Sequence, residues 1–87
     1  MLVRYFGAAQ AAAGVAEERL DLGSAPLETV LGQITARYPV AVNPGAPSMT
    51  QVIARSSFLL NEVSARDRHR VLGPDDVLDI LPPFAGG

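Results

Sequence analysis

The sequence predicts an α+β roll in which one main helix crosses a small mixed sheet of four or five strands. Three observations support this fold class. Short runs of β-branched, aromatic and aliphatic residues lie near both ends of the chain, and such runs are typical of strands. A longer central stretch repeats apolar residues at helical spacing. Clusters of glycine, proline and asparagine separate these stretches and indicate turns.

The first run, Leu2 to Phe6, is predicted to be a strand. Side chains alternate across a strand. Val3 and Tyr5 are therefore expected on the buried face, because Arg4 occupies the other face. Leu2 and Phe6 share the face of Arg4, which is either covered locally or used to bind a partner.

A short helix and a second strand are predicted next. Ala8 to Ala13 is rich in alanine and helical by propensity, and Gly14 is suited to end the helix. Arg19 to Leu22 alternates in polarity, which predicts a strand with Leu20 and Leu22 facing inward. The first two strands are expected to pair antiparallel.

The main helix is predicted from Pro26 to Tyr38, and its opening proline suits the first helical turn. Ser24 or Ala25 would occupy the cap position, and Pro39 would stop the helix. Gly32 is expected to permit close approach of the helix to the sheet. The apolar stripe at helical spacing consists of Leu27, Val30, Leu31, Ile34 and Tyr38.

Shorter elements are predicted in the second half of the chain. Residues 40–48 contain an Asn-Pro-Gly sequence and are expected to form a loop, followed by a helical turn over residues 49–55. Ser57 to Leu60 is predicted to be the third strand. Asn61-Glu62 is expected to form a turn, after which Val63-Ser64 pairs briefly.

The last strand is predicted from Val77 to Leu81, after a charged surface stretch at residues 66–70. Leu78 and Ile80 are expected in the core, and Asp79 is expected to point outward. The order strand, strand, helix, strand, strand, with one long helix on a small sheet, is the β-grasp or ubiquitin-like pattern.

Composition excludes several classes of function. The chain has 87 residues, which indicates one domain, and no cysteine, which excludes disulfides, thiolate metal sites and a cysteine nucleophile. The net charge of −2 argues against nucleic-acid binding. No apolar run approaches the length of a membrane span, and the first residues lack a signal-peptide pattern. A cytoplasmic protein is expected.

All basic residues are arginine, and lysine is absent. A coding bias toward arginine explains this. A second hypothesis is that an activated C-terminus is protected when no ε-amine can attack it. The second hypothesis would be wrong if added surface lysines caused no self-conjugation.

The side chains provide no plausible enzyme site. The lone histidine, His69, lies among arginines and is expected to be a solvated surface residue. Asp75 and Asp76 lie in a predicted turn, where aspartate is common, and Asp79 lies in a strand. These positions explain the three aspartates better than a metal site does. A single histidine in a charged loop supports no catalytic triad, and no glycine-rich loop precedes a helix as a phosphate site requires.

The C-terminal sequence Pro82-Pro83-Phe84-Ala85-Gly86-Gly87 carries the strongest functional signal. We expect a β-grasp domain over residues 1–81 and an extended tail over residues 82–87. Prolines end the strand and stiffen its exit, and Phe84 is suited to anchor the tail in an apolar pocket. Gly86 and Gly87 are thin and flexible, so that they would deliver the terminal carboxylate into a buried site on another protein, up to ~20 Å away. The simpler alternative is a strand terminator followed by a frayed end.

A carboxylate is a poor electrophile and must be activated before it transfers anything. This chain lacks a nucleotide site, and we expect it to bind no cofactor itself, so that a partner must supply ATP. Attack of a persulfide on an acyl-adenylate would leave a thiocarboxylate at the tip of the tail.

These residues resemble the MoaD/ThiS family of ubiquitin-like sulfur carriers, and most closely the small subunits of molybdopterin synthase. The resemblance rests on Val3 to Ala9 with the alanine-rich stretch to Gly14, on the helix from Pro26, and above all on residues 73–87. It covers nearly the whole chain and departs most over residues 39–55.

The resemblance implies a cycle that involves other proteins. An adenylyltransferase similar to ubiquitin-activating enzymes would adenylate Gly87, and a persulfide donor would then supply sulfur. The tail would enter the large synthase subunit of a heterotetramer, where sulfur is donated to build the molybdopterin dithiolene. Gly86 would shape the fit to the channel. Phe58 and Leu60 are weaker contact candidates that are equally well interpreted as core residues, and the stronger partner contacts would be Leu81, Pro82, Pro83, Phe84 and Ala85.

Alternatives with the same tail remain open. A ThiS-type carrier for thiamine thiazole, a carrier that feeds cysteine synthesis and a protein modifier would all use the terminal glycine. A β-grasp interaction module whose tail is never activated belongs to a different class. Intact mass after incubation with ATP, an activating enzyme and a sulfur source would separate the carriers from the module.

Overall fold

The computed structural model describes residues 1–83 and contains a mixed sheet of five strands in the order β2-β1-β7-β4-β5. The neighbouring strands β1 and β7 are parallel, and the other pairs are antiparallel. This arrangement confirms the predicted α+β roll. The strands are β1 (Leu2–Tyr5), β2 (Glu17–Arg19), β4 (Ser57–Leu60), β5 (Val63–Ser64) and β7 (Val77–Leu81).

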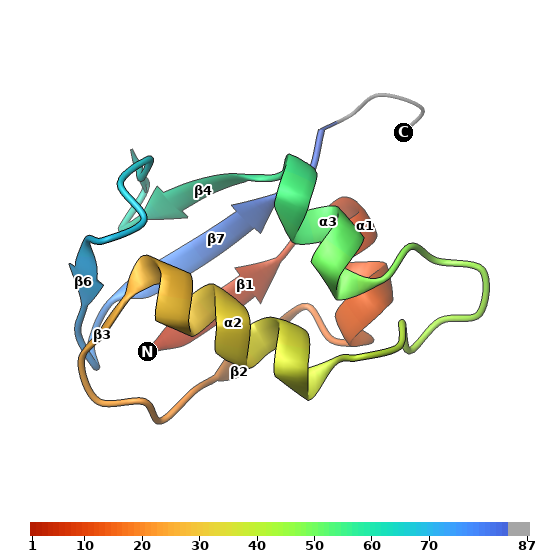
Figure 1. The fold of residues 1–87 in the computed structure, drawn as a ribbon, viewed down its shortest axis with the longest axis horizontal. Coiled ribbons are helices and arrows are strands. Elements are labelled where there is room, and N and C mark those ends of the chain that lie inside the picture. Colours follow the sequence, from red (N-terminus) through yellow and green to blue (C-terminus); the bar gives the residue numbers. More distant parts are fainter. Residues whose placement is uncertain (84–87) are drawn as a thin grey trace.

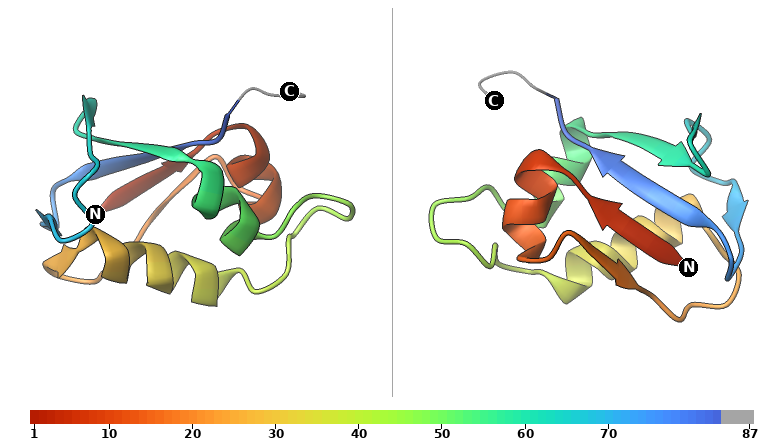
Figure 2. Two further views of the ribbon diagram at one scale, coloured as in Figure 1. Left: turned by 45° about the horizontal axis from the view of Figure 1, so that its top comes forward. Right: turned by 180° about the vertical axis from the view of Figure 1, so that it is seen from behind.

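Helices cover one face of the sheet (Figure 1). Helix α2 (Leu27–Arg37) crosses this face, while α1 (Gly7–Ala13) and α3 (Met49–Arg55) lie together at the end where β1 and β7 finish. The view from behind shows that, among residues 1–83, no helix covers the opposite face (Figure 2). This opposite face is called the outer face below.

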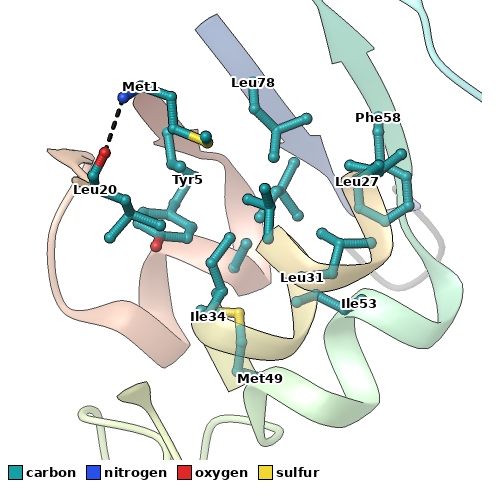
Figure 3. Close-up of a cluster of buried hydrophobic side chains, with 14 of the residues drawn as sticks. Met1, Tyr5, Leu20, Leu27, Leu31, Ile34, Met49, Ile53, Phe58 and Leu78 are labelled. Atoms are coloured by element: carbon teal, nitrogen blue, oxygen red, sulfur yellow. Dashed lines mark hydrogen bonds between the residues drawn. The ribbon is translucent and has the colours of Figure 1, made fainter. Parts of the chain in front are cut away.

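The core lies between α2 and the sheet. Figure 3 shows Leu27, Leu31 and Ile34 of α2 pointing toward Tyr5 and Leu78 of the sheet. All five side chains are at most 3% exposed. Most of the predicted stripe is therefore buried, as expected for an amphipathic helix on a sheet. Tyr38, at the end of the stripe, is half-buried against the core.

The second strand lies earlier than predicted. The ladder with β1 pairs Leu2 with Arg19 and Arg4 with Glu17, and the assigned strand ends before Leu20. Leu20 is nevertheless buried, as expected. Its carbonyl oxygen accepts a 2.8 Å hydrogen bond from the amino group of Met1 (Figure 3), and its N–H donates a 2.8 Å hydrogen bond to the carbonyl oxygen of Met1.

Helix α2 begins without a side-chain cap. Pro26 itself is the N-cap residue, so that the expectation of a cap at Ser24 or Ala25 is wrong. The first two helical N–H groups donate instead to the carbonyl oxygens of Arg70 and Arg68, at 2.8 and 2.9 Å. These bonds satisfy donors that the first helical turn leaves free. They continue a two-stranded ladder that the sequence did not reveal, between β3 (Ala25–Pro26) and β6 (Val71–Leu72).

The loop over residues 39–48 packs on the end of α1. The N–H groups of Val42 and Asn43 donate to carbonyl oxygens of Ala12 and Ala11. Gly14 ends α1 with φ +76°, and a Cβ built at Gly14 would lie 2.6 Å from Cγ1 of Val42. A glycine is thus required where the loop meets the helix.

Gly32 does not have its predicted role. It lies on the exposed side of α2, and a Cβ built there meets no atom within 4 Å. Glycine in the interior of a helix is disfavoured because it loses more backbone entropy than alanine on folding.

We therefore expect Gly32→Ala to stabilise the protein by about 1 kcal/mol and to raise Tm by about 5 °C. Gly14→Ala is the matched control and should lower Tm, because its backbone and its neighbour Val42 both disfavour a side chain. Thermal unfolding followed by circular dichroism measures both variants. An unchanged or lower Tm for Gly32→Ala would contradict this account of the helix.

A partly buried cluster joins the edge strand β2 to the end of α2. The hydroxyl groups of Tyr5 and Tyr38 each donate to Oε2 of Glu18 at 2.6 Å, and Nε of Arg37 lies 2.9 Å from Oε1. Burial and the Glu18 carboxylate raise the pKa values of both phenols. Both tyrosines are therefore held in the neutral form when the protein is folded.

This cluster predicts an alkaline limit to stability. Raised pKa values in the folded state give a stabilisation that is fully present below the ordinary tyrosine pKa of about 10 and is lost as pH rises above it. The urea midpoint should fall between about pH 9 and about pH 11, and Tyr38→Phe should reduce this dependence. A midpoint that stays constant over this range would disprove the prediction.

Candidate functional site

The predicted tail begins at the end of the central part of the sheet. Strand β7 lies between β1 and β4, and in these ladders Ile80 pairs with Tyr5 while Leu81 pairs with Ser57. The strand ends at Leu81, and Pro82-Pro83 follows without regular structure. Because proline has no N–H group to donate, the ladder stops here. We call residues 81–83 the tail root.

The tail root is held to β4 through the pairing of Leu81 with Ser57, and its side chains become more exposed toward Pro83. Leu81 and Pro82 are half-buried, and Pro83 is exposed. Phe84, Ala85, Gly86 and Gly87 lie outside the described residues, so that their predicted roles remain predictions. The division between a domain over residues 1–81 and a tail likewise remains a prediction.

A groove of about 490 Å³ lies beside the tail root. Its walls are formed by α1, by α3 together with Pro47, which precedes the N-cap of α3, and by the two prolines of the tail root. Arg55 contributes a cation, but the lining is otherwise largely apolar. The lining residues are Ala8, Pro47, Gln51, Val52, Ala54, Arg55, Pro82 and Pro83. A protein that holds the tail root would also meet this groove.

The outer face next to the root carries an ion pair among apolar side chains. Nε and Nη2 of Arg4 donate to the two carboxylate oxygens of Asp79 at 2.5 and 2.7 Å. This contact raises the pKa of the Arg4 guanidinium. Leu59 and Leu81 flank the pair half-buried, and Phe6, just after β1, is 41% exposed.

Asp79 lies on the predicted face but is not exposed to solvent. Only 4% of the residue is exposed, because β7 is flanked on both sides and Arg4 lies against the carboxylate. A buried carboxylate requires such a partner. Within the pair, the positive charge of Arg4 and the negative charge of Asp79 neutralise each other.

Phe58 and Leu60 do not belong to this surface. They are 5% and 3% exposed and pack in the core, which favours their interpretation as core residues, while a contact with a partner remains a prediction. Strand alternation explains the result, since their neighbours Ser57 and Leu59 take the outer face.

Among the remaining polar candidates, His69 is exposed, as predicted, and Asp76 has a structural role. The side chain of His69 is 83% exposed. Asp76 accepts hydrogen bonds from the backbone of Gly73 at 2.7 Å and from the side chain of Asn61 at 2.9 Å, which lower its pKa. Within residues 1–83 no group of three potential metal ligands comes together, and no helix is long and apolar enough to span a membrane.

Residues 3–87 match the ThiS family. The chain belongs to the ThiS family. This match confirms the predicted resemblance to MoaD/ThiS-type sulfur carriers. It includes the last four residues, so that the family assignment extends over the whole predicted tail. No curated protein sequence matches this member of the family.

Two solved structures show that this ThiS-family chain has the β-grasp fold. One is a Pyrococcus furiosus protein with the provisional name molybdopterin converting factor, subunit 1, which matches with a TM-score of 0.73 and 22% identity over 95% of each chain. The other is the Haloferax volcanii HVO 2177 protein, with a TM-score of 0.71 and 19% identity over 99% of this chain and 84% of that one.

Sequence reasoning missed the surroundings of the tail root in this ThiS-family protein. The groove joins α1, α3 and two prolines that are distant in sequence. The ion pair joins residues 75 positions apart. One signal for the pair was available, because Arg4 and Asp79 each interrupt an otherwise apolar strand.

Proposed function

We propose that this protein is a sulfur carrier that acts as the small subunit of molybdopterin synthase and holds sulfur as a thiocarboxylate on Gly87. The observation that carries the proposal is the tail root. The chain leaves the end of a strand that is paired on both sides, through two prolines, beside an apolar groove and an uncovered sheet face. Membership of the ThiS family supports the same conclusion.

The proposed chemistry takes place on the terminal carboxylate. One carboxylate oxygen of Gly87 attacks the α-phosphorus of ATP on an adenylyltransferase, which forms the acyl-adenylate and releases pyrophosphate. The terminal sulfur of a persulfide then attacks the acyl carbon, and AMP leaves. A thiol cleaves the resulting acyl disulfide, so that the thiol is oxidised to a disulfide and the thiocarboxylate remains on Gly87.

The domain contributes binding and position rather than catalysis. Partners would hold the tail root, the groove and the outer face around Arg4 and Asp79, while the glycines enter a narrow channel. Glycine suits such a channel because it has no Cβ. A fixed root is also favourable because fewer residues must be ordered when the complex forms.

Two acceptor pathways are compatible with this carrier. The name of the Pyrococcus furiosus structure supports molybdopterin, as does the resemblance of residues 73–87. A carrier for thiamine thiazole is the second candidate, since the matching family bears the ThiS name.

Transfer to defined acceptors tests the proposal. Thiocarboxylated protein would be mixed with the large molybdopterin synthase subunit and a cyclic pyranopterin monophosphate, or with a thiazole synthase and its substrates. We expect sulfur to leave the carrier only in the first mixture, with molybdopterin formed. Transfer in the thiazole mixture alone would favour the second candidate, and transfer in neither would contradict both.

A further inference from the structure

A second hollow, of about 240 Å³, includes Ser57, the ladder partner of Leu81 in the tail root. It is formed by the start of β4 and the segment that follows β5. Its polar lining residues are three serines and two arginines. The lining residues used below are Ser57, Phe58, Ser64, Arg66 and Arg68. We call it the arginine hollow.

The arginine hollow carries positive charge that the described part of the chain does not neutralise. The ion pairs among residues 1–83 involve Arg4, Arg37 and His69, but neither Arg66 nor Arg68. The carboxylate of the intervening Asp67 accepts a hydrogen bond from the backbone of His69 at 2.9 Å. A local excess of positive charge therefore lies on a chain whose net charge is −2.

The hollow is also held in shape. The guanidinium carbon of Arg68 lies 5.3 Å from the ring centroid of Phe58, which is in the range of a cation–π contact. The carbonyl group of Arg68 accepts the N–H of Glu28, and that of Arg70 accepts the N–H of Leu27. The backbone at Arg68 and Arg70 is thus hydrogen-bonded to the start of α2, which reduces the conformational entropy lost when this segment binds an anion.

The position of the hollow indicates what would fill it. Ser57 pairs directly with Leu81, so that the hollow adjoins the last residue before Pro82. A tail extended into a channel places its tip up to ~20 Å from this point. Nucleotide or pterin groups at the tip would therefore not reach the hollow, whereas the protein surface around the channel mouth would.

We propose that the arginine hollow binds an acidic segment of the adenylyltransferase that receives the tail. Aspartate or glutamate carboxylates of that segment accept hydrogen bonds from Arg66 and Arg68, and further hydrogen bonds from the hydroxyl groups of Ser57 and Ser64. Charge-assisted bonds of this kind are stronger than neutral ones. Complementary charge chiefly increases the association rate. This inference rests on the proposed function, because a tail that is never received needs no such contact.

Steady-state kinetics with the adenylyltransferase from the same genome tests the inference. We expect Arg66→Glu and Arg68→Glu each to raise the KM for the carrier roughly tenfold at low salt, with kcat unchanged. The effect should shrink as ionic strength rises. Arg19→Glu, an equal change of charge on the exposed edge strand β2, is the control and should leave KM within about twofold.

A direct binding experiment uses the unmodified protein. Amide shifts of Ser57, Ser64 and Arg68 should move in NMR spectra when a hexaglutamate peptide is added, and should move less with inorganic phosphate. Equal KM values for hollow and control variants, or shifts with phosphate but not with the peptide, would overturn the inference. If wild-type protein were never adenylated, the proposed function would fail, whereas normal adenylation with insensitive variants refutes the arginine hollow alone.

Discussion

Deletion of Gly87 should reduce sulfur loading at least ~100-fold, because misplacing a reacting group by much less than one residue already causes losses of that size. The shortened chain would still end in a glycine carboxylate, but one residue too early to reach the activating site. The measurement is the rate of thiocarboxylate formation with ATP, the adenylyltransferase and a persulfide donor.

The same deletion should leave the fold intact. The core side chains come from residues 1–80, and the last ladder pair is Leu81 with Ser57. We expect Tm to stay within about 2 °C of the wild type. Gly32→Ala is the matched control, since it changes a glycine on α2 away from the tail root and should load sulfur normally. Normal loading by the deletion variant would show that the last residue is not the reactive one.

Substitution of Ile80 by aspartate should unfold or strongly destabilise the domain at room temperature. Ile80 is 0% exposed and pairs with Tyr5 on one side and Phe58 on the other. An unpaired carboxylate there would cost more than ~4 kcal/mol. Single domains have a total stability of about 5–15 kcal/mol, so that circular dichroism should show loss of structure or a Tm far below that of the wild type.

Val77→Asp is the control on the same strand. Val77 lies on the outer face and is half-buried, so that the new carboxylate would remain hydrated and cost about 1 kcal/mol. A cooperative transition with near-native Tm for Ile80→Asp would mean that the assigned faces of β7 are wrong.

Elements dominated by local signals were predictable from the sequence. Strands β4 and β7 occupy the predicted residues, and α2 carries the predicted apolar stripe. Alternation and helical spacing determine these elements because each must bury one side. The predicted turn at Asn61-Glu62 is confirmed by positive φ values of 51° and 69°.

Features that depend on distant residues were not predictable. The two-residue strands β3 and β6 are too short to show a sequence pattern of their own. They continue into the hydrogen bonds that the first N–H groups of α2 donate to the carbonyl oxygens of Arg70 and Arg68. We predicted that Gly32 allows α2 to approach the sheet closely, but this depends on which side of α2 faces the sheet, and Gly32 lies on the exposed side. Asp79 was placed on the correct face, but its burial depends on Arg4 at the other end of the chain.

The candidate site likewise has one part that was predictable from the sequence and one part that was not. The tail could be predicted from the sequence alone, because two prolines end a strand and two glycines give a thin, flexible chain. Its surroundings could not, because the groove and the arginine hollow join segments from α1, α3, β4 and the residues after β5.

The most direct test of the account is the intact mass of the full chain after incubation with ATP, the adenylyltransferase and a persulfide donor, with fragmentation to locate the change. We predict replacement of one oxygen by one sulfur, located on Gly87 and dependent on ATP. An unchanged mass in a mixture that loads another ThiS-family carrier, or sulfur located elsewhere in the chain, would contradict the claim that this protein carries sulfur on its last residue.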